Sequence, residues 1–293
     1  MFSRCSASVR IAAVIFRAVI LLLLSGLAGA TLIRIAPGFG IDEQVLDPRL
    51  SLRSQELLHR GHEGERNPLA FYIRFLAGLF RGDAGRSNVF GQPVAALIRE
   101  RIPTTIRTVL AGLALGWGLA VLFATVSALN GRPVTILAAL ALSGALISLP
   151  SAVLAIACLL LSLPPATAIA AVVFPRVFPH AYEQLRASLA KPHVIMARAR
   201  GVSRTRVFLF HVVPAALLPL LALAAVSTAL AFGASIPIEA LADSPGIGQL
   251  AWRVALGRDL PVLVSITLLL TAVTVIANLP ADLLAERLRR NAK

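Results

Sequence analysis

A run of 43 residues without Asp, Glu, Lys or Arg lies between Arg132 and Arg176. A membrane-spanning helix needs about 20 apolar residues, so this run is long enough for two spans. The sequence Leu163-Pro164-Pro165 divides the run into two parts, since proline interrupts a helix. The run therefore predicts that the chain crosses a bilayer.

The composition of the whole chain agrees with a protein that spans a membrane several times. Of its 293 residues, 57% are hydrophobic and 14% are charged, and the mean hydropathy is +0.82. These values are too apolar for a soluble protein. The net charge of +14 does not indicate a nucleic-acid partner, because the basic residues flank apolar segments and lack interleaved aromatic residues. Cys5 and Cys158 imply no disulfide framework.

The first apolar segment, from Ile11 to Ile33, is interrupted only by Arg17 and ends in an Ala-Gly-Ala sequence that imitates a signal peptidase site. Its length of about 23 residues exceeds that of the apolar region of a signal peptide and suffices to cross a bilayer. We therefore predict that residues 1–33 form a retained N-terminal transmembrane helix.

The other apolar segments complete an all-α bundle of six transmembrane helices. The second begins after Pro103, which suits the first turn of a helix, and its Gly112, Gly116 and Gly118 allow close helix approach. The second, fourth, fifth and sixth spans are predicted at Thr104 to Leu129, Ala166 to Arg186, Ala215 to Ile236 and Pro261 to Ala281. The third occupies the charge-free run before Leu163. Residues 104–293 would form a five-helix core.

Residues 34–103 form the only long hydrophilic segment, which we predict to lie outside the cytoplasm. The positive-inside rule is weak for loops of this length. Within the segment, Phe71 to Phe80 predicts a short amphipathic helix, and residues 92–101 an interfacial helix. The apolar face of the first comprises Phe71, Phe75, Leu76, Leu79 and Phe80. His59 and His62 have a metal-chelating spacing, but they lack a third ligand and are expected to be solvated.

A short basic turn begins the stretch from His193 to Pro219. Arg198, Arg200, Arg204 and Arg206 surround Gly201, and no charged residue follows until Glu239. Lys and Arg beside a span stay on the cytoplasmic side. The pattern predicts a cytoplasmic loop, at about residues 187–213, between the fourth and fifth spans, with both chain termini also in the cytoplasm.

This loop resembles the EAA loop of permeases from binding-protein-dependent ABC importers, in the branch that handles dipeptides, oligopeptides and nickel. The matching residues are Ala197, Arg198, Ala199, Arg200, Gly201, Ser203, His211 and Ala215 to Pro219. The acidic residue that names the motif in other branches is absent, and Ile195 stands where this branch usually has Arg.

Two further blocks are similar to the same branch, in the same order along the chain. The first, from Phe80 to Ile106, contains Gly-Asp-x-Gly-Arg-Ser and Gly-Gln-Pro-Val. The second, from Ile238 to Ser265, matches at Glu239, Pro245, Gly246, Gly248, Arg258, Asp259 and Pro261. Ser244 replaces the usual Trp of this block, and Gln249 the usual Arg.

The resemblance implies a permease subunit of an ATP-driven importer in the bacterial inner membrane, with peptides as the default substrate and nickel or a metal chelate as the alternative. It implies as partners a second, similar permease, two ABC ATPase subunits and an extracytoplasmic substrate-binding protein. A short cytoplasmic helix would fit an ATPase groove. The residues expected at that joint are Ala197, Arg198, Arg200, Gly201 and Ser203.

The chain itself carries no G-x-x-x-x-G-K-[ST] loop, so ATP and Mg²⁺ would belong to the ATPase partners. It also lacks G-x-S-x-G and H-E-x-x-H, so we expect neither an enzyme nor a resident cofactor or metal. An ion-coupled secondary carrier, the remaining alternative, would need paired acidic residues at mid-membrane, and none is evident.

Four charged residues are candidates for the transport pathway or a gate: Arg176, Glu239, Asp83 and Arg86. Arg176 lies in the fourth span, where a charge is costly unless it faces a cavity or a partner. Two alternatives remain open. In the first, Arg176 lines the transport pathway. In the second, the helix is displaced toward an interface or broken at Pro175 and Pro179, and Arg176 lies among the headgroups. For Asp83 and Arg86, a role in clamping the loop backbone is favoured over docking or gating.

Overall fold

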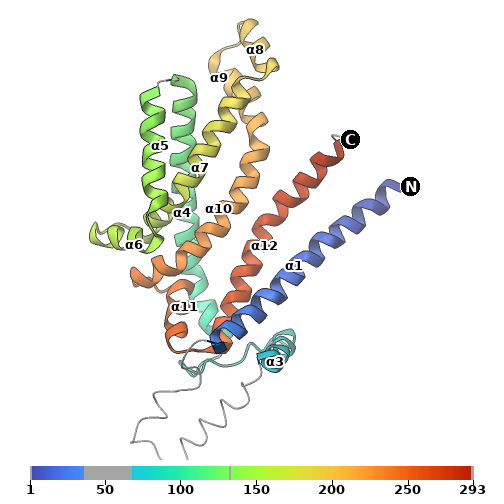
Figure 1. Ribbon diagram of the computed structural model, residues 1–293, viewed down its shortest axis with the longest axis vertical. Helices are drawn as coiled ribbons and strands as arrows, with labels where there is room; N and C mark the ends of the chain where they lie inside the picture. Colours follow the sequence, from blue (N-terminus) through green and yellow to red (C-terminus); the bar gives the residue numbers. More distant parts are fainter. Residues whose placement is uncertain (1, 36–67, 132, 292–293) are drawn as a thin grey trace, which may run out of the picture. The chain divides into compact units, whose positions relative to one another are not determined.

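The computed structural model describes residues 2–35, 68–131 and 133–291 (Figure 1). These residues are almost entirely helical and contain no strand, apart from one isolated bridge between Arg86 and Pro93. The predicted all-α class is confirmed. His59 and His62 lie outside the described residues.

The helices divide into two compact units. One comprises residues 1–102 and 250–272, and the other comprises residues 103–249 and 273–293. Along the chain the helices are α1 (Phe2–Ile35), α3 (Pro68–Phe80), α4 (Val94–Asn130), α5 (Pro133–Ser148), α6 (Ser151–Leu160), α7 (Pro165–Leu189), α8 (Pro192–Ala199), α9 (Arg204–Val207), η1 (Phe208–Val212), α10 (Val213–Leu241), α11 (Ile247–Leu256) and α12 (Leu260–Asn291).

In the first unit, α3 packs against α1 and the beginning of α12. Tyr72 and Phe75 are buried with Leu268, and the Tyr72 hydroxyl donates a 2.9 Å hydrogen bond to the carbonyl of Leu23. Burial raises the pKa of this hydroxyl. Gly26 permits the contact, because a Cβ there would lie 2.6 Å from the Tyr72 oxygen.

The amphipathic helix predicted at Phe71 to Phe80 is confirmed by α3, but only part of its predicted face is covered. Phe71, Phe75 and Leu76 belong to the buried cluster or pack against it. Phe80 is 90% exposed, and Leu79 is 43% exposed. The helical spacing therefore identified the face, and its C-terminal end is left exposed.

The second span differs from its prediction at its start. The chain does not begin a helix after Pro103, because α4 runs through this proline as one helix of 37 residues. A proline inside a helix removes one backbone hydrogen bond. The separate interfacial helix predicted at residues 92–101 is therefore the first part of α4, which begins at Val94.

The segment predicted as the third span is bent, which the charge-free run did not reveal. Helices α5 and α6 meet at an angle of 103° across Leu149 and Pro150. The residue before a proline is driven out of helical geometry, so α5 ends there. By length and composition, three described helices can cross a membrane, namely α4, α10 from Pro219 and α12 to Leu279, and the bent pair raises this number to four.

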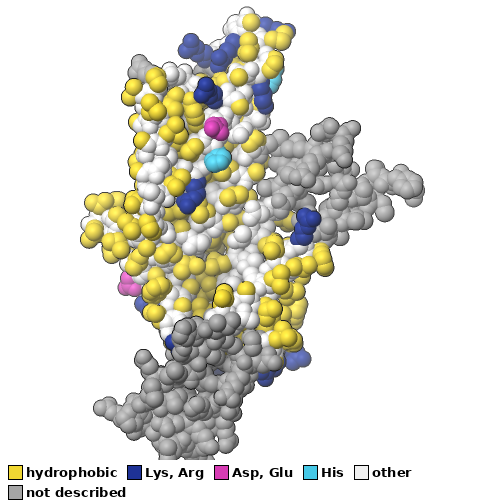
Figure 2. All heavy atoms as spheres, in the orientation of Figure 1, with side chains coloured by type: hydrophobic (Ala, Val, Ile, Leu, Met, Phe, Trp, Pro, Cys, Tyr) yellow, Lys and Arg dark blue, Asp and Glu magenta, His cyan; other side chains and the backbone are white. Residues whose placement is uncertain are grey.

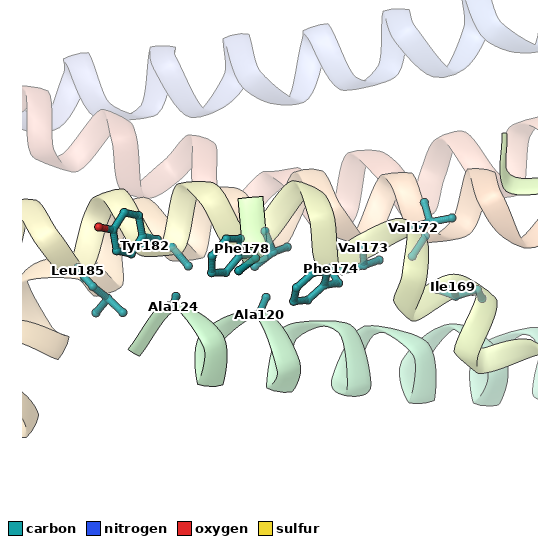
Figure 3. Packing of buried hydrophobic residues seen from close by; sticks show 14 of the residues in the cluster. Ala120, Ala124, Ile169, Val172, Val173, Phe174, Phe178, Tyr182 and Leu185 are labelled. Carbon is teal, nitrogen blue, oxygen red and sulfur yellow. The ribbon is translucent and has the colours of Figure 1, made fainter. Parts of the chain in front are cut away.

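Helix α7 forms the core of the second unit with α4 and α10. Figure 3 shows the α7 side chains of Phe174 and Phe178 directed at Ala120 and Ala124 of α4. The two phenyl rings are stacked, with centroids 5.7 Å apart. Lipid is as apolar as these side chains, so close packing rather than escape from water holds such helices together.

The glycine face predicted on α4 is confirmed at two of its three positions. A Cβ on Gly112 would lie 2.6 Å from Ile169, and one on Gly116 would lie 3.0 Å from Val173. Both glycines therefore let α4 approach α7. No atom lies within 4 Å of the corresponding position on Gly118.

Of the alternatives left open for the fourth span, the helix broken at its prolines is not the one observed. Helix α7 continues for 25 residues with Pro175 and Pro179 inside it. Arg176 therefore lies near the middle of an intact helix, about 17 Å from its first residue and about 20 Å from its last at 1.5 Å per residue.

Candidate coupling and pathway sites

The basic loop folds into a compact tip where α7 ends and α10 begins (Figure 1). Pro192 begins α8, and Val194 and Ala197 turn toward the core of the unit, with 0% and 8% of their surface exposed. Gly201 then reverses the chain with a φ of +77°. Only glycine adopts this conformation without strain, which accounts for its place in the loop. Ala197 thus packs within the tip and does not face outward.

The outer face of the tip combines two apolar side chains with four arginines. Ile195 and Met196 are each 56% exposed. Arg198, Arg200, Arg204 and Arg206 are also exposed, and Figure 2 shows basic side chains gathered at this end of the unit. An apolar pair within a basic rim is a surface suited to a groove on another protein.

Ser203 and His211 lie in the connection from the tip to α10. Ser203 occupies the N-cap position of α9, where its side chain makes no capping bond and its carbonyl accepts a 2.9 Å bond from the Val207 N–H. His211 lies in η1, a π-helix that leads into α10. Its Nδ1 atom is buried and has no hydrogen-bond partner among the described residues. π-Helical turns are rare and cluster at functional sites.

At the other end of α10, the carboxylate of Glu239 binds residues of α4 and of the first turn of α11, all within the second unit. Glu239 is fully buried. Its Oε2 atom accepts a 3.0 Å bond from the Thr105 hydroxyl of α4 and a 2.7 Å bond from the Gly248 N–H of α11. Thr105 in turn accepts a 2.7 Å bond from the Ile247 N–H. A carboxylate at the first N–H groups of a helix is stabilised by the helix dipole.

Two glycines make room for this carboxylate. A Cβ on Gly246 would lie 2.1 Å from Glu239 Oε2, and one on Gly248 would lie 2.6 Å from the Ser235 carbonyl. Both glycines of the Pro-Gly-x-Gly sequence that starts at Pro245 are therefore required, because a side chain at either position would collide with α10. Glu239, Thr105, Gly246 and Gly248 are called the Glu239 lock below.

The exposed face of α7 carries a polar stripe. Arg176, His180, Glu183 and Arg186 are all exposed and recur at helical spacing, and Figure 2 shows basic, acidic and histidine side chains in a line over α7. Arg176 Nη1 donates a 3.0 Å hydrogen bond to the Val172 carbonyl of the same helix. Such a face on a membrane helix requires water, a ligand or a partner subunit.

In the first unit, Asp83 and Arg86 bond to the backbone of their own loop. Asp83 Oδ1 accepts a 2.8 Å bond from the Gly85 N–H, and Arg86 Nη2 donates a 2.8 Å bond to the Gly91 carbonyl. These contacts are those of the loop clamp favoured from the sequence.

The same loop is joined to the start of α12 through Asp259. This carboxylate is fully buried. It accepts hydrogen bonds from the Ser87 hydroxyl and, at 3.1 Å, from the Val89 N–H. Gly257 approaches closely as well, since a Cβ there would lie 2.5 Å from Val89. Two of the three resembling blocks therefore meet within this unit.

Comparison with known proteins identifies the family. Residues 120–293 match the family described as the binding-protein-dependent transport system inner membrane component. The chain belongs to this family. It is thus an inner membrane component with several apolar helices, and the resemblance drawn from the three sequence blocks is confirmed.

Relatives of this inner membrane component are bacterial permeases. The chain is 29% identical to a Brucella ovis protein whose name assigns it provisionally as a peptide permease, over 86% of the chain and 88% of the relative. It is 25% identical to the dipeptide transport system permease protein DppB of Lactococcus lactis, over 81% and 85%. It is 24% identical to the oligopeptide transport system permease protein AppB of Bacillus subtilis, over 82% and 85%.

Sequence reasoning missed part of the machinery of this inner membrane component. Thr105 is separated from Glu239 by 134 positions, and no periodicity signals their contact. Asp259 was matched within a motif, but no role followed from the match. The sequence did contain one indication of both the Glu239 contact and the role of Asp259. Each is an acidic residue beside an apolar span, and such a residue needs a partner.

Proposed function

We propose that the chain is a permease subunit of an ATP-driven ABC importer for peptides. The names of its relatives support the substrate class. In this proposal it forms the translocation pathway with a second, similar permease, receives substrate from an extracytoplasmic binding protein, and has no catalytic role. ATP and Mg²⁺ bind to two ATPase partners.

The observation that carries the proposal is the exposed tip at α8. Ile195 and Met196 enter an apolar groove of the ATPase, and Arg198 and Arg200 contact its rim. Ala197, Gly201 and Ser203 shape the helix and the turn that present these side chains. Helix-in-groove docking of this kind uses an apolar helix face as its anchor.

Helix α10 transmits the movement of the tip. It contains 29 residues and is therefore about 43 Å long at 1.5 Å per residue. The tip adjoins one end of α10, and the Glu239 lock ties the other end to α4 and α11. Closure of the ATPase pair displaces the tip, and the packed helices of the unit move together, as in rigid-body switching.

The proposed topology has six spans, with both termini in the cytoplasm. The spans are α1, α4, the bent pair α5 and α6, α7, α10 and α12. Residues 1–33 form the first span, residues 34–103 the extracytoplasmic segment, and residues 104–293 the core with its cytoplasmic loop at about 187–213.

The charged candidates take two roles. Arg176 lines the pathway, because it is exposed at the middle of α7. Glu239 in one unit, and Asp83 with Arg86 in the other, hold the local backbone through the hydrogen bonds described above. We assign to each of these two backbone segments a role in gating.

Co-purification and coupled ATP hydrolysis test the proposal. Tagged chain, expressed with its neighbouring genes, should recover an ATPase, and substrate with binding protein should stimulate ATP hydrolysis. Gly201→Asp should weaken stimulation at least about tenfold, since an acidic charge enters the basic rim. Gly201→Asn is the matched control, because it has the same shape, tolerates positive φ and adds no charge. Recovery of no ATPase, or unchanged stimulation in Gly201→Asp, refutes the proposal.

A further inference from the structure

The second unit contains a cavity of about 630 Å³ at the bend between α5 and α6. A volume of this size accommodates a small ligand. The cavity is bounded by the bend, by α7 and by α10, and its lining includes Leu146, Ser148, Ser151, Val172, Arg176 and Leu230. Its other walls are mainly aliphatic apart from Ser148 and Ser151, and Arg176 is the only charged residue in the lining.

The guanidinium of Arg176 is not neutralised within the described part of the chain. Its one hydrogen bond there goes to the Val172 carbonyl, and a guanidinium has five N–H donors in a planar fork. The acidic residue of the same stripe, Glu183, follows seven positions later and borders a different cavity, with Pro133 and Arg186. The cavity therefore offers a cation with free donors and no bound counter-charge.

A charge among aliphatic walls at membrane depth is stabilised by an anion that enters the same space. A planar fork binds a carboxylate through two parallel hydrogen bonds, which a point charge cannot do. The aliphatic walls fit an apolar side chain beside that carboxylate. The site is suited to the last residue of a peptide, which carries both groups on one carbon atom.

We propose that Arg176 binds the C-terminal carboxylate of the transported peptide in this cavity, with the side chain of the peptide's last residue against the aliphatic walls. The proposal rests on the peptide-importer function above and names the part of the substrate that the permease recognises. It also assigns a reason for a cation on α7, since the charge selects substrates with a free C-terminus.

The test compares free peptides with their C-terminal amides. The complete complex, with binding protein and ATPase subunits, is reconstituted in proteoliposomes and given a library of di- to pentapeptides in both forms. Uptake is read by mass spectrometry as the ratio of acid to amide. Any preference of the binding protein is the same in all variants and cancels when these ratios are compared.

Wild type should prefer the acids, and Arg176→Gln should lower the ratio at least about tenfold, as expected for loss of a charge-assisted bond. Arg176→Lys should retain part of the preference. Arg186→Gln is the matched control, because it removes an exposed arginine of the same helix outside the cavity, and it should leave the ratio unchanged.

Three outcomes overturn the inference while leaving the importer function intact. They are an unchanged ratio in Arg176→Gln, an equal loss of acid and amide uptake, and an equal fall of the ratio in Arg186→Gln. Equal loss would assign Arg176 to contact with the second permease. If wild type takes up neither form, the peptide-importer function itself fails, and the inference fails with it.

Discussion

Gly246→Ala is expected to break the Glu239 lock. The new methyl carbon would lie 2.1 Å from Glu239 Oε2, whereas such atoms in contact are about 3.5 Å apart. The carboxylate must move by more than an ångström and lose its bonds to Thr105 and Gly248. Each hydrogen bond to a charged group contributes about 1.5–3 kcal/mol, so the free energy of unfolding should fall by about 3–6 kcal/mol.

The assay is thermal unfolding of the detergent-solubilised chain, followed as the fraction that remains monodisperse after heating. At about 2 °C per kcal/mol for a chain of this size, Gly246→Ala should lower Tm by about 6–12 °C. Gly118→Ala is the control, because no atom lies within 4 Å of its new methyl position. It should leave Tm unchanged or raise it slightly, since alanine favours the helix by about 1 kcal/mol.

A double-mutant cycle tests the cause of the loss. Glu239→Ala removes the carboxylate that collides with the methyl group, so adding Gly246→Ala to it should cost about 2 kcal/mol less than in wild type. If the two costs are additive, the loss does not arise from this contact. A Tm equal to that of wild type in Gly246→Ala would refute the lock itself.

Further substitutions test the other close contacts by the same thermal assay. Gly112→Ala places a methyl carbon 2.6 Å from Ile169 and should cost about 1–3 kcal/mol as an overpacked contact; an unchanged Tm would contradict the tight packing of α4 on α7. Ser87→Ala removes a hydroxyl donor from buried Asp259 and should cost about 1.5–3 kcal/mol, whereas a stabilised variant would show that the bond contributes nothing. Tyr72→Phe removes one bond to α1 and should cost about 1 kcal/mol, which a Tm at or above wild type would disprove.

Local patterns were sufficient for elements whose signal lies in neighbouring residues. The helix at Phe71 to Phe80 was predicted because its large apolar side chains recur at helical spacing. Gly112 and Gly116 were predicted to allow helix approach because small residues one turn apart leave a groove. In both cases the information is contained within a few turns.

The missed features depend on context that local patterns do not contain. Pro103 is compatible with a helix start and with a helix interior, and the length of the flanking helical sequence decided between them. Pro150 lies within a charge-free run, so hydropathy gave no sign of the bend that creates the cavity. The partners of Glu239 come from α4 and α11, and only the packed structure brings them together.

The π-helix at Phe208 to Val212 fixes the rotational setting of the tip. A π-turn holds one residue more than an α-turn would hold in the same place, and each residue of an α-helix turns the chain by about 100°. The inserted residue therefore sets which way the arginines and the Ile195–Met196 pair face about the axis of α10. Removal of a single residue from this segment would point the same tip in another direction without altering any side chain on it.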